Sequence, residues 1–140
     1  MVLFVSIVVA GIGGPRWSET WAPLRVVAGI AIAIAGLVLF IGGLAALGSS
    51  LTPFPRPLEK ATLRTNGVYR FARHPIYGGS LLLALSLALL TSPVALLPAV
   101  LLGILFELKS RHEESFLVLR FPAYDSYRRR VRWRFIPGVR

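Results

Sequence analysis

The sequence predicts an all-helical integral membrane protein with about four membrane-embedded helices, the last two forming a short hairpin, followed by a basic cytoplasmic C-terminal segment. Of its 140 residues, 55% are hydrophobic and 16% are charged, and the mean hydropathy is +0.68. Soluble domains carry about 25% charged residues. The formal charge of +10 is concentrated at the ends of long uncharged runs, which is typical of a protein in a bilayer. Its length predicts a single domain over residues 1–140.

The first two predicted helices cover residues 2–14 and 22–48. The second has 27 residues with Arg25 as its single charge, and it exceeds the ~20 residues that cross the hydrocarbon core. Small residues recur along it at four-residue spacing, which allows close helix packing in a membrane. Residues 2–14 are short for a span, and a signal peptide is the alternative. The poor cleavage context of Gly13-Gly14-Pro15 favours a retained helix.

The predicted hairpin comes from residues 76–108, an apolar run of 33 residues whose single charge is Glu107. As one straight helix this run would measure ~50 Å, which exceeds the thickness of the hydrocarbon core. Thr91-Ser92-Pro93 supplies a break, because proline lacks a backbone donor and disfavours a helical conformation in the residue before it. We therefore expect two helices, at about 75–90 and 93–112.

The charges between the helices predict the orientation in the membrane. Residues 52–75 carry five basic residues against one acid, and residues 109–140 carry nine against three. Cytoplasmic segments of membrane proteins are enriched in Lys and Arg, so both stretches and both termini are expected in the cytoplasm. The arginine run at 128–134, beside several membrane segments, suits anionic lipid headgroups as its partner rather than nucleic acid.

Polar residues that can support chemistry concentrate in residues 66–80 and 109–137. In the first stretch, Pro75 at the first helical position leaves the amides of residues 76–78 without intrahelical acceptors. Beside Arg73, such a helix end suits an anion such as a carboxylate or phosphate. The alternative is a purely structural role in which the arginines contact lipid headgroups. With two histidines and no cysteine, no metal site is predicted.

In the second stretch, acidic and basic residues crowd the predicted membrane boundary. Glu107 and Arg111 are four residues apart, as are Lys109 and Glu113, and side chains at this spacing pair on one helix face. Pairing alone does not explain why so many ionisable groups stand where withdrawal from water is costly. Such groups are commonly retained for function.

Two ordered motifs carry a resemblance to a known family. The first motif reads Gly67-x-Tyr69-x-x-x-Arg73-His74-Pro75-x-Tyr77-x-Gly79, and the second comprises Glu113-Glu114, then Phe121-x-x-Tyr124-x-x-Tyr127, then Ile136-Pro137. Over about residues 65–137, half the chain, this pattern resembles the isoprenylcysteine carboxyl methyltransferase family and the related phospholipid methyltransferases. The chain departs from that pattern at Pro122, where the family usually has glycine.

The resemblance implies an integral membrane enzyme that uses S-adenosylmethionine at the cytoplasmic face to methylate a lipophilic or prenylated acceptor. Carboxylate O-methylation is preferred, and phospholipid N-methylation is the alternative. The resemblance also implies a cofactor site formed by Arg73, His74, Pro75, Tyr77, Gly79, Glu113, Glu114, Tyr124 and Tyr127. Glu114 and Arg111 are the candidate catalytic residues. Glu114 or Glu113 would act as base for an ammonium acceptor, and Arg111 would orient an acidic one.

Two other classes of protein remain open. Sterol-type reductases have a similar membrane hairpin, but their motif resembles Asn-Tyr-x-Gly-Asp, where this chain has Ile76 and Ser80 at the flanking places. A non-enzymatic scaffold or transporter subunit, with a basic tail on anionic lipid, predicts that His74 and the glutamate pair are dispensable. The sequence predicts neither the identity of the acceptor nor the oligomeric state.

Overall fold

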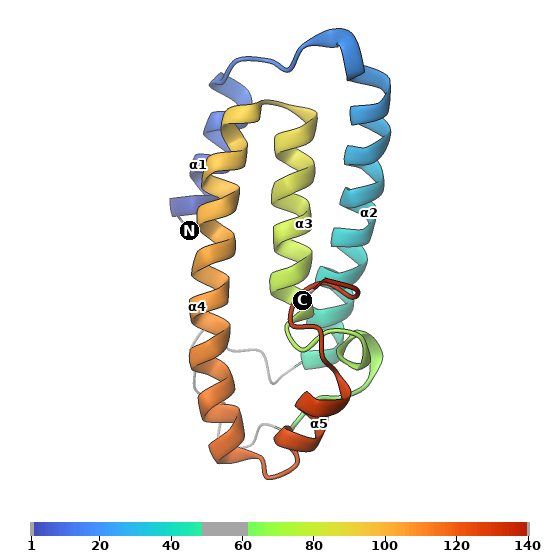
Figure 1. Cartoon of the computed structure of the whole chain (residues 1–140), viewed down its shortest axis with the longest axis vertical. Coiled ribbons are helices and arrows are strands. Elements are labelled where there is room, and N and C mark those ends of the chain that lie inside the picture. Colours follow the sequence, from blue (N-terminus) through green and yellow to red (C-terminus); the bar gives the residue numbers. More distant parts are fainter. Residues whose placement is uncertain (1, 49–61, 140) are drawn as a thin grey trace. The chain divides into compact units, whose positions relative to one another are not determined.

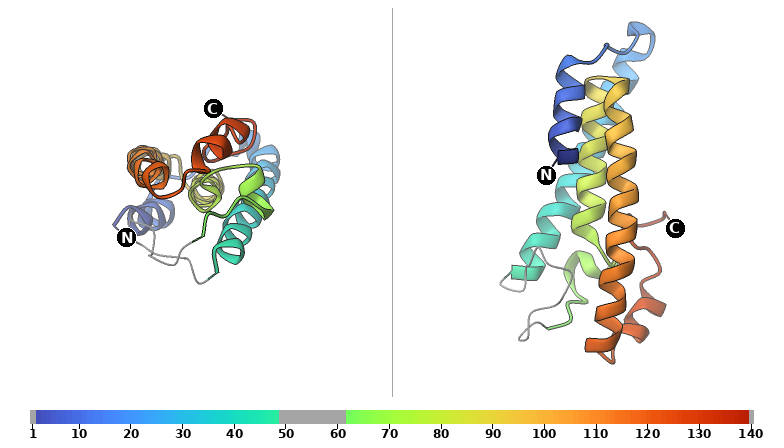
Figure 2. Two further views of the ribbon diagram at one scale, coloured as in Figure 1. Left: turned by 90° about the horizontal axis from the view of Figure 1, so that it is seen from below. Right: turned by 90° about the vertical axis from the view of Figure 1, so that its left-hand side faces the viewer.

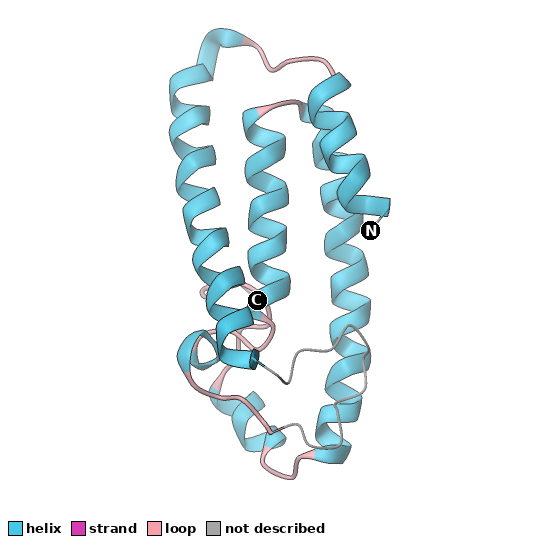
Figure 3. Ribbon diagram, turned by 180° about the vertical axis from the view of Figure 1, so that it is seen from behind, coloured by secondary structure: helices cyan, strands magenta, loops and turns pink. Residues whose placement is uncertain are grey.

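All the regular structure is helical in the part of the chain that the computed structural model describes, residues 2–48 and 62–139 (Figure 3). The elements in chain order are α1 (Val2–Gly13), η1 (Glu19–Trp21), α2 (Ala22–Leu47), η3 (Gly67–Arg70), α3 (Pro75–Leu90), η4 (Pro93–Ala95), α4 (Leu96–Arg120) and α5 (Tyr124–Arg130), where η marks a short 3-10 helix. The all-helical prediction is confirmed for these residues. Arg56 and Lys60, which contributed to the predicted cytoplasmic charge, lie outside the described residues.

The break between α3 and α4 lies at Thr91-Ser92-Pro93. The Ser92 hydroxyl oxygen accepts a hydrogen bond from the Val94 amide at 3.3 Å and caps η4. The second helix of the hairpin, predicted at about 93–112, begins at Pro93 with η4 and continues as α4 to Arg120, so the start is as predicted and the predicted end is too early. It extends because residues 109–120 contain neither glycine nor proline, so Pro122 is the first residue that stops it.

The chain forms two compact units. The first unit consists of Met1–Val38 and Gly79–Leu105, and the second unit consists of Leu39–Gly78 and Phe106–Arg140. Helices α2, α3 and α4 therefore each contribute residues to both units. Most of the motif residues belong to the second unit.

In the first unit, side chains from the connection between α1 and α2 and from the first turn of α2 bind the end of α3. Trp17 Nε1 donates a hydrogen bond to the Ala88 carbonyl oxygen at 2.9 Å, and Arg25 Nη1 donates to that of Leu89 at 2.6 Å. Carbonyl groups at a helix end often lack intrahelical partners, and these bonds supply a donor for the Leu89 carbonyl and a further one for that of Ala88, which also accepts from the Ser92 amide. Helix α1 packs against η4 in the same unit (Figure 1).

Two helical stretches of the described residues are long and apolar enough to cross a membrane, Glu19–Leu47 and Pro93–Arg120. Helices α1 and α3 are apolar but shorter. Large apolar side chains are exposed along one face of α2, namely Val27, Ile30, Ile34 and Ile41. A continuous apolar surface of this kind is unfavourable in water and suits contact with lipid.

In the second unit, α5 returns alongside the end of α4 (Figure 2). One hydrophobic cluster of the second unit consists of the buried side chains of Tyr124, Tyr127 and Val131. Partly buried apolar side chains pack around this cluster, namely Leu63, Leu117, Val118 and Phe121. The aromatic residues of the second motif therefore fix the short helix α5 to the longer helix that carries the glutamate pair.

Candidate active site

A glycine turn and helix α5 fix the loop that leads into α3. Gly67 has a φ of +58°, a left-handed conformation that glycine adopts without strain. The Tyr127 hydroxyl donates a hydrogen bond to the Tyr69 carbonyl oxygen at 2.6 Å. Burial raises the pKa of Tyr127, so this hydroxyl keeps the proton that it donates. The second motif thereby holds the backbone of the first.

Residues 131–135, which we call the C-terminal segment, cover the start of α3. The amide of Arg73 donates to the carbonyl oxygen of Trp133 at 3.1 Å, and the amide of His74 donates to that of Arg134 at 2.7 Å. The backbones of two consecutive residues of the Arg-His-Pro motif are therefore hydrogen-bonded to the backbone of the C-terminal segment.

The Arg73 side chain is the centre of a buried network. Its Nη1 donates to the carbonyl oxygens of residues 131 and 132, at 2.8 and 3.0 Å. Its Nε lies 2.8 Å from Glu114 Oε1, and His74 Nε2 lies 3.2 Å from the same oxygen. The three side chains are only 7–8% exposed. Glu114 therefore accepts hydrogen bonds in a nearly water-free position, where charge-assisted bonds are strong.

The second glutamate, Glu113, completes the surroundings of the imidazole. Its Oε2 lies 3.6 Å from His74 Nδ1, and its Oε1 accepts a hydrogen bond from the Tyr77 hydroxyl at 2.6 Å. Lys109 Nζ lies 3.9 Å from Glu113 Oε1. Each ring nitrogen of His74 thus faces a carboxylate, which fixes the orientation of the imidazole for either position of its proton.

Aromatic rings form a stack beside these carboxylates. The Tyr77 ring is parallel to the His74 ring at a centroid distance of 5.6 Å and stacks on Phe106 at 4.5 Å. The Lys109 ammonium lies 5.3 Å from the centroid of the Tyr77 ring. This is a cation–π contact, so the face of Tyr77 already receives a cationic group next to Glu113.

The structure therefore brings together five of the predicted site residues, Arg73, His74, Tyr77, Glu113 and Glu114. Pro75 is fully buried at the first position of α3. Tyr124 and Tyr127 belong to the core of the second unit. Burial, and then the charge of Glu114, raise the pKa of Tyr124, so its hydroxyl stays neutral.

Two predicted site residues lie elsewhere. The Arg111 side chain is 68% exposed and pairs through Nε with Glu107 at 2.8 Å. Glu107 also accepts from Arg134, so Arg111 is linked to the Arg73 network through this carboxylate rather than directly. Gly79 is buried in the first unit, where a Cβ on Gly36 would lie 3.1 Å from its carbonyl oxygen. This glycine allows α2 and α3 to approach closely there.

The helix end that the sequence predicts to be open to an anion is used by the chain itself. The Gly78 amide donates to the His74 carbonyl oxygen at 3.0 Å, and the Phe135 backbone packs so closely that a Cβ on Gly78 would overlap it. The Arg73 guanidinium is also bonded within the chain, through Nε to Glu114 and through Nη1 to a carbonyl oxygen of the C-terminal segment. The Gly78 amide and the Nε and Nη1 groups of Arg73 are thus already bonded within the chain, which corrects the prediction that they are free for an anion.

Residues that the sequence did not single out also join the network. Arg134 donates from Nη1 to Glu107 Oε1, and its Nε lies 3.6 Å from Glu114 Oε1. Glu107 and Glu114 are seven residues apart, and this spacing places both on one helix face. Their spacing could have predicted that Glu107 and Glu114 share a helix face. Nothing in the sequence pointed to Phe106 or to Arg134 in particular.

Comparison with known proteins assigns the chain to a family. The sequence profile of the phospholipid methyltransferase family matches residues 24–123, which include the Arg-His-Pro motif and both glutamates. The chain therefore belongs to the phospholipid methyltransferase family. A methyltransferase domain and apolar helices of this kind indicate a membrane methyltransferase.

The cobalt-zinc-cadmium resistance protein CzcN of Cupriavidus metallidurans is a relative. It is 30% identical over 128 residues, which cover 85% of this chain and 53% of that protein. The chain thus spans about half the length of this relative. Among the described residues of this chain, no group of three or more His, Cys, Asp or Glu side chains could hold a metal ion.

Proposed function

We propose that the chain is an S-adenosylmethionine-dependent methyltransferase that modifies a lipophilic or prenylated acceptor at the cytoplasmic face of a membrane. The observation that carries this proposal is the network in which Arg73 and His74, at the start of α3, meet Glu113 and Glu114 of α4. These pairs are about 40 residues apart in the sequence, and they lie within the part of the chain that matches the family.

The residues of the second unit fit the chemistry of this methyl donor. A sulfonium is a cation, and the Tyr77 face beside the Glu113 carboxylate already accommodates the Lys109 ammonium. The Tyr124 hydroxyl is buried beside the Glu114 carboxylate, and burial, together with this negative charge, raises its pKa, so it stands as a neutral group next to the network. When bound, S-adenosylmethionine supplies an activated methyl group for in-line displacement.

The network supports different roles for the two glutamates. Glu114 Oε1 already accepts from Arg73 and His74, so taking a further proton would disrupt a buried ion pair. Glu113 is more exposed, at 18% of its side chain. We therefore assign positioning to Glu114 and, for an ammonium acceptor, the role of base to Glu113. A carboxylate acceptor needs no base, and alignment of the two reactants then carries the catalysis.

The acceptor group is either the carboxylate that the sequence favours or the amine of a phospholipid headgroup, as the family description implies. The Arg111 side chain is 68% exposed and contacts the network at Glu107 rather than at His74 or Glu114, so we assign it no catalytic role. Mass spectrometry of lipid extracts incubated with the protein and an isotopically labelled donor distinguishes O-methyl from N-methyl products.

For the membrane arrangement, we propose four embedded helices with both termini in the cytoplasm. Helices α1 and α3 are short, and bilayer thinning accommodates short helices. The arginines of α5, together with Arg132, are exposed, which suits contact with anionic headgroups on the cytoplasmic side.

Binding of S-adenosylmethionine to detergent-purified protein, measured by calorimetry, tests the proposed function. We expect the wild type to bind, and His74→Ala to bind about tenfold to a hundredfold more weakly, because a hydrogen-bonded group next to two carboxylates is lost. His112→Ala is the matched control, since this other histidine is exposed and contacts Phe116 instead.

Absence of binding by the wild type would remove the donor from the proposal. Equal weakening by His74→Ala and His112→Ala would remove the site assignment while leaving the donor in place.

A further inference from the structure

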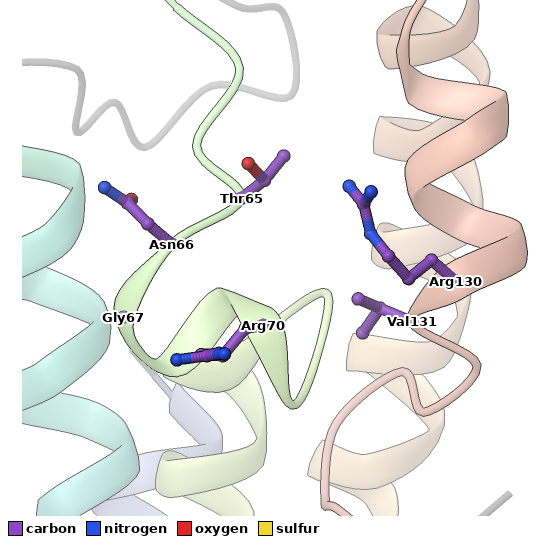
Figure 4. A pocket seen from close by; sticks show the side chains of 6 residues that line it. All are labelled: Thr65, Asn66, Gly67, Arg70, Arg130 and Val131. Carbon is purple, nitrogen blue, oxygen red and sulfur yellow. The ribbon is translucent and has the colours of Figure 1, made fainter.

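A hollow of about 400 Å³ opens in the second unit, and its lining includes none of the side chains of the Arg73 network. It is lined by Thr65, Asn66, Gly67, Arg70, Arg130 and Val131 (Figure 4). Its volume falls in the range of roughly 300–1,000 Å³ that small-molecule sites occupy. Two parts of the chain form it, the loop at 65–70 and the end of α5, and the Tyr127–Tyr69 hydrogen bond holds these parts together.

The charge of this hollow is not balanced by the described residues. Arg70 and Arg130 both line it, and neither lies within ion-pair distance of a described carboxylate. None of the six lining residues is acidic. Arg128, on the same helix as Arg130, pairs instead with Asp125 at 2.9 Å. Since arginine stays protonated in proteins, the hollow presents two positive charges that lack a counter-charge.

The uncharged lining residues add hydrogen-bond donors. Figure 4 shows the Arg130 guanidinium reaching toward Thr65, while the Arg70 guanidinium lies on the Asn66 side. A guanidinium, a hydroxyl and an amide are all donors, and guanidinium groups bind phosphate oxygens in a bidentate manner. Donors that approach from two sides suit the tetrahedral oxygens of a phosphate better than the two coplanar oxygens of a carboxylate.

We propose that this hollow is a binding site for a phosphate group, with Arg70 and Arg130 as its cationic residues. The phosphate belongs either to a phospholipid headgroup or to a free phosphate ion. The site is separate from the proposed donor site and stands whether or not the Arg73 network holds a methyl donor. Val131 connects the two, because it lines the hollow and its carbonyl oxygen accepts from Arg73.

The test uses the full chain purified in detergent and two probes, a short-chain phosphatidylglycerol and inorganic phosphate, with binding measured by calorimetry. We expect the double variant Arg70→Gln, Arg130→Gln to bind the preferred probe about tenfold to a hundredfold more weakly than the wild type, because two charge-assisted contacts are lost. The single variants Arg130→Gln and Arg129→Gln are the matched pair, since each removes one charge from neighbouring positions of α5 and only Arg130 lines the hollow.

The outcomes separate the sources of the phosphate and the competing explanations. Binding of the lipid without competition by inorganic phosphate identifies a headgroup site, and binding of inorganic phosphate identifies a free-ion site. Failure of the wild type to bind either probe overturns the proposal, as does equal weakening by Arg130→Gln and Arg129→Gln, which would indicate a diffuse basic surface. Both arginines are exposed, and an unchanged melting temperature of the double variant shows that it is folded.

Binding of S-adenosylmethionine to the same double variant distinguishes this proposal from the proposed function. We expect donor binding to be retained. Loss of donor binding with phosphate binding unchanged would place the donor's carboxylate in the hollow and overturn the phosphate site. Absence of donor binding in the wild type, with the phosphate results as expected, would contradict the methyltransferase proposal alone.

Discussion

Replacement of Glu114 by alanine is expected to lower the free energy of unfolding by about 3–5 kcal/mol, because it leaves the buried Arg73 guanidinium without its counter-charge. Both side chains are under 10% exposed, so water cannot replace the lost carboxylate. Unfolding in mixed micelles with increasing SDS, followed by circular dichroism, measures this change. The same variant is expected to lose donor binding, since His74 Nε2 also loses its acceptor.

The exposed pair of Asp125 and Arg128 supplies the control for this experiment. Its side chains are 44% and 48% exposed, and exposed ion pairs contribute only about 0–1 kcal/mol. Asp125→Ala should therefore have little effect on unfolding. A Glu114→Ala variant that is as stable as Asp125→Ala would show that the Arg73–Glu114 pair is not buried as described.

Alanine at Gly78 is expected to displace the C-terminal segment from the start of α3. A Cβ at this position would overlap the Phe135 carbonyl oxygen, which is a backbone atom and cannot rotate away. The expected loss of stability is about 1–3 kcal/mol. Trypsin cleavage within residues 131–135 should also be faster, because the hydrogen bonds to Arg73 and His74 hold this segment.

Gly103 is the matched control, since it is also a helical glycine and a Cβ there would lie 3.7 Å from the nearest side-chain atom, an ordinary contact. Gly103→Ala should raise the stability by roughly 0.5–1 kcal/mol, because alanine is the better helix former. If both variants are cleaved by trypsin at the wild-type rate, the segment does not pack on Gly78.

The elements that sequence predicted well are those set by local chemistry. Pro75 starts α3, and Thr91-Ser92-Pro93 forms the break between α3 and α4, because proline restricts the backbone wherever it occurs. The pairing of Arg111 with Glu107, at 2.8 Å, follows from their four-residue spacing alone. The predicted end of the last membrane helix, at about 112, is too early, because residues 109–120 contain neither glycine nor proline and the helix continues to Arg120.

The contacts that could not be predicted join distant parts of the chain. Arg73 and Glu114 are 41 residues apart, and only the resemblance to a known family indicated that their segments meet. Nothing local indicated that backbone carbonyls of the C-terminal segment would bind Arg73. A helix start with a free arginine suits an anion, but in the folded chain Arg73 donates instead to Glu114 and to carbonyl oxygens of the C-terminal segment.

Crosslinking of labelled S-adenosylmethionine by ultraviolet light, followed by tryptic digestion and mass spectrometry, is the most direct measurement of whether the start of α3 and the glutamate pair of α4 form one donor site. We predict label on two peptides, residues 74–109 and 112–120, and loss of label from both in the His74→Ala variant. Label confined to peptides before residue 61, or label on only one of the two that survives His74→Ala, would contradict a shared site.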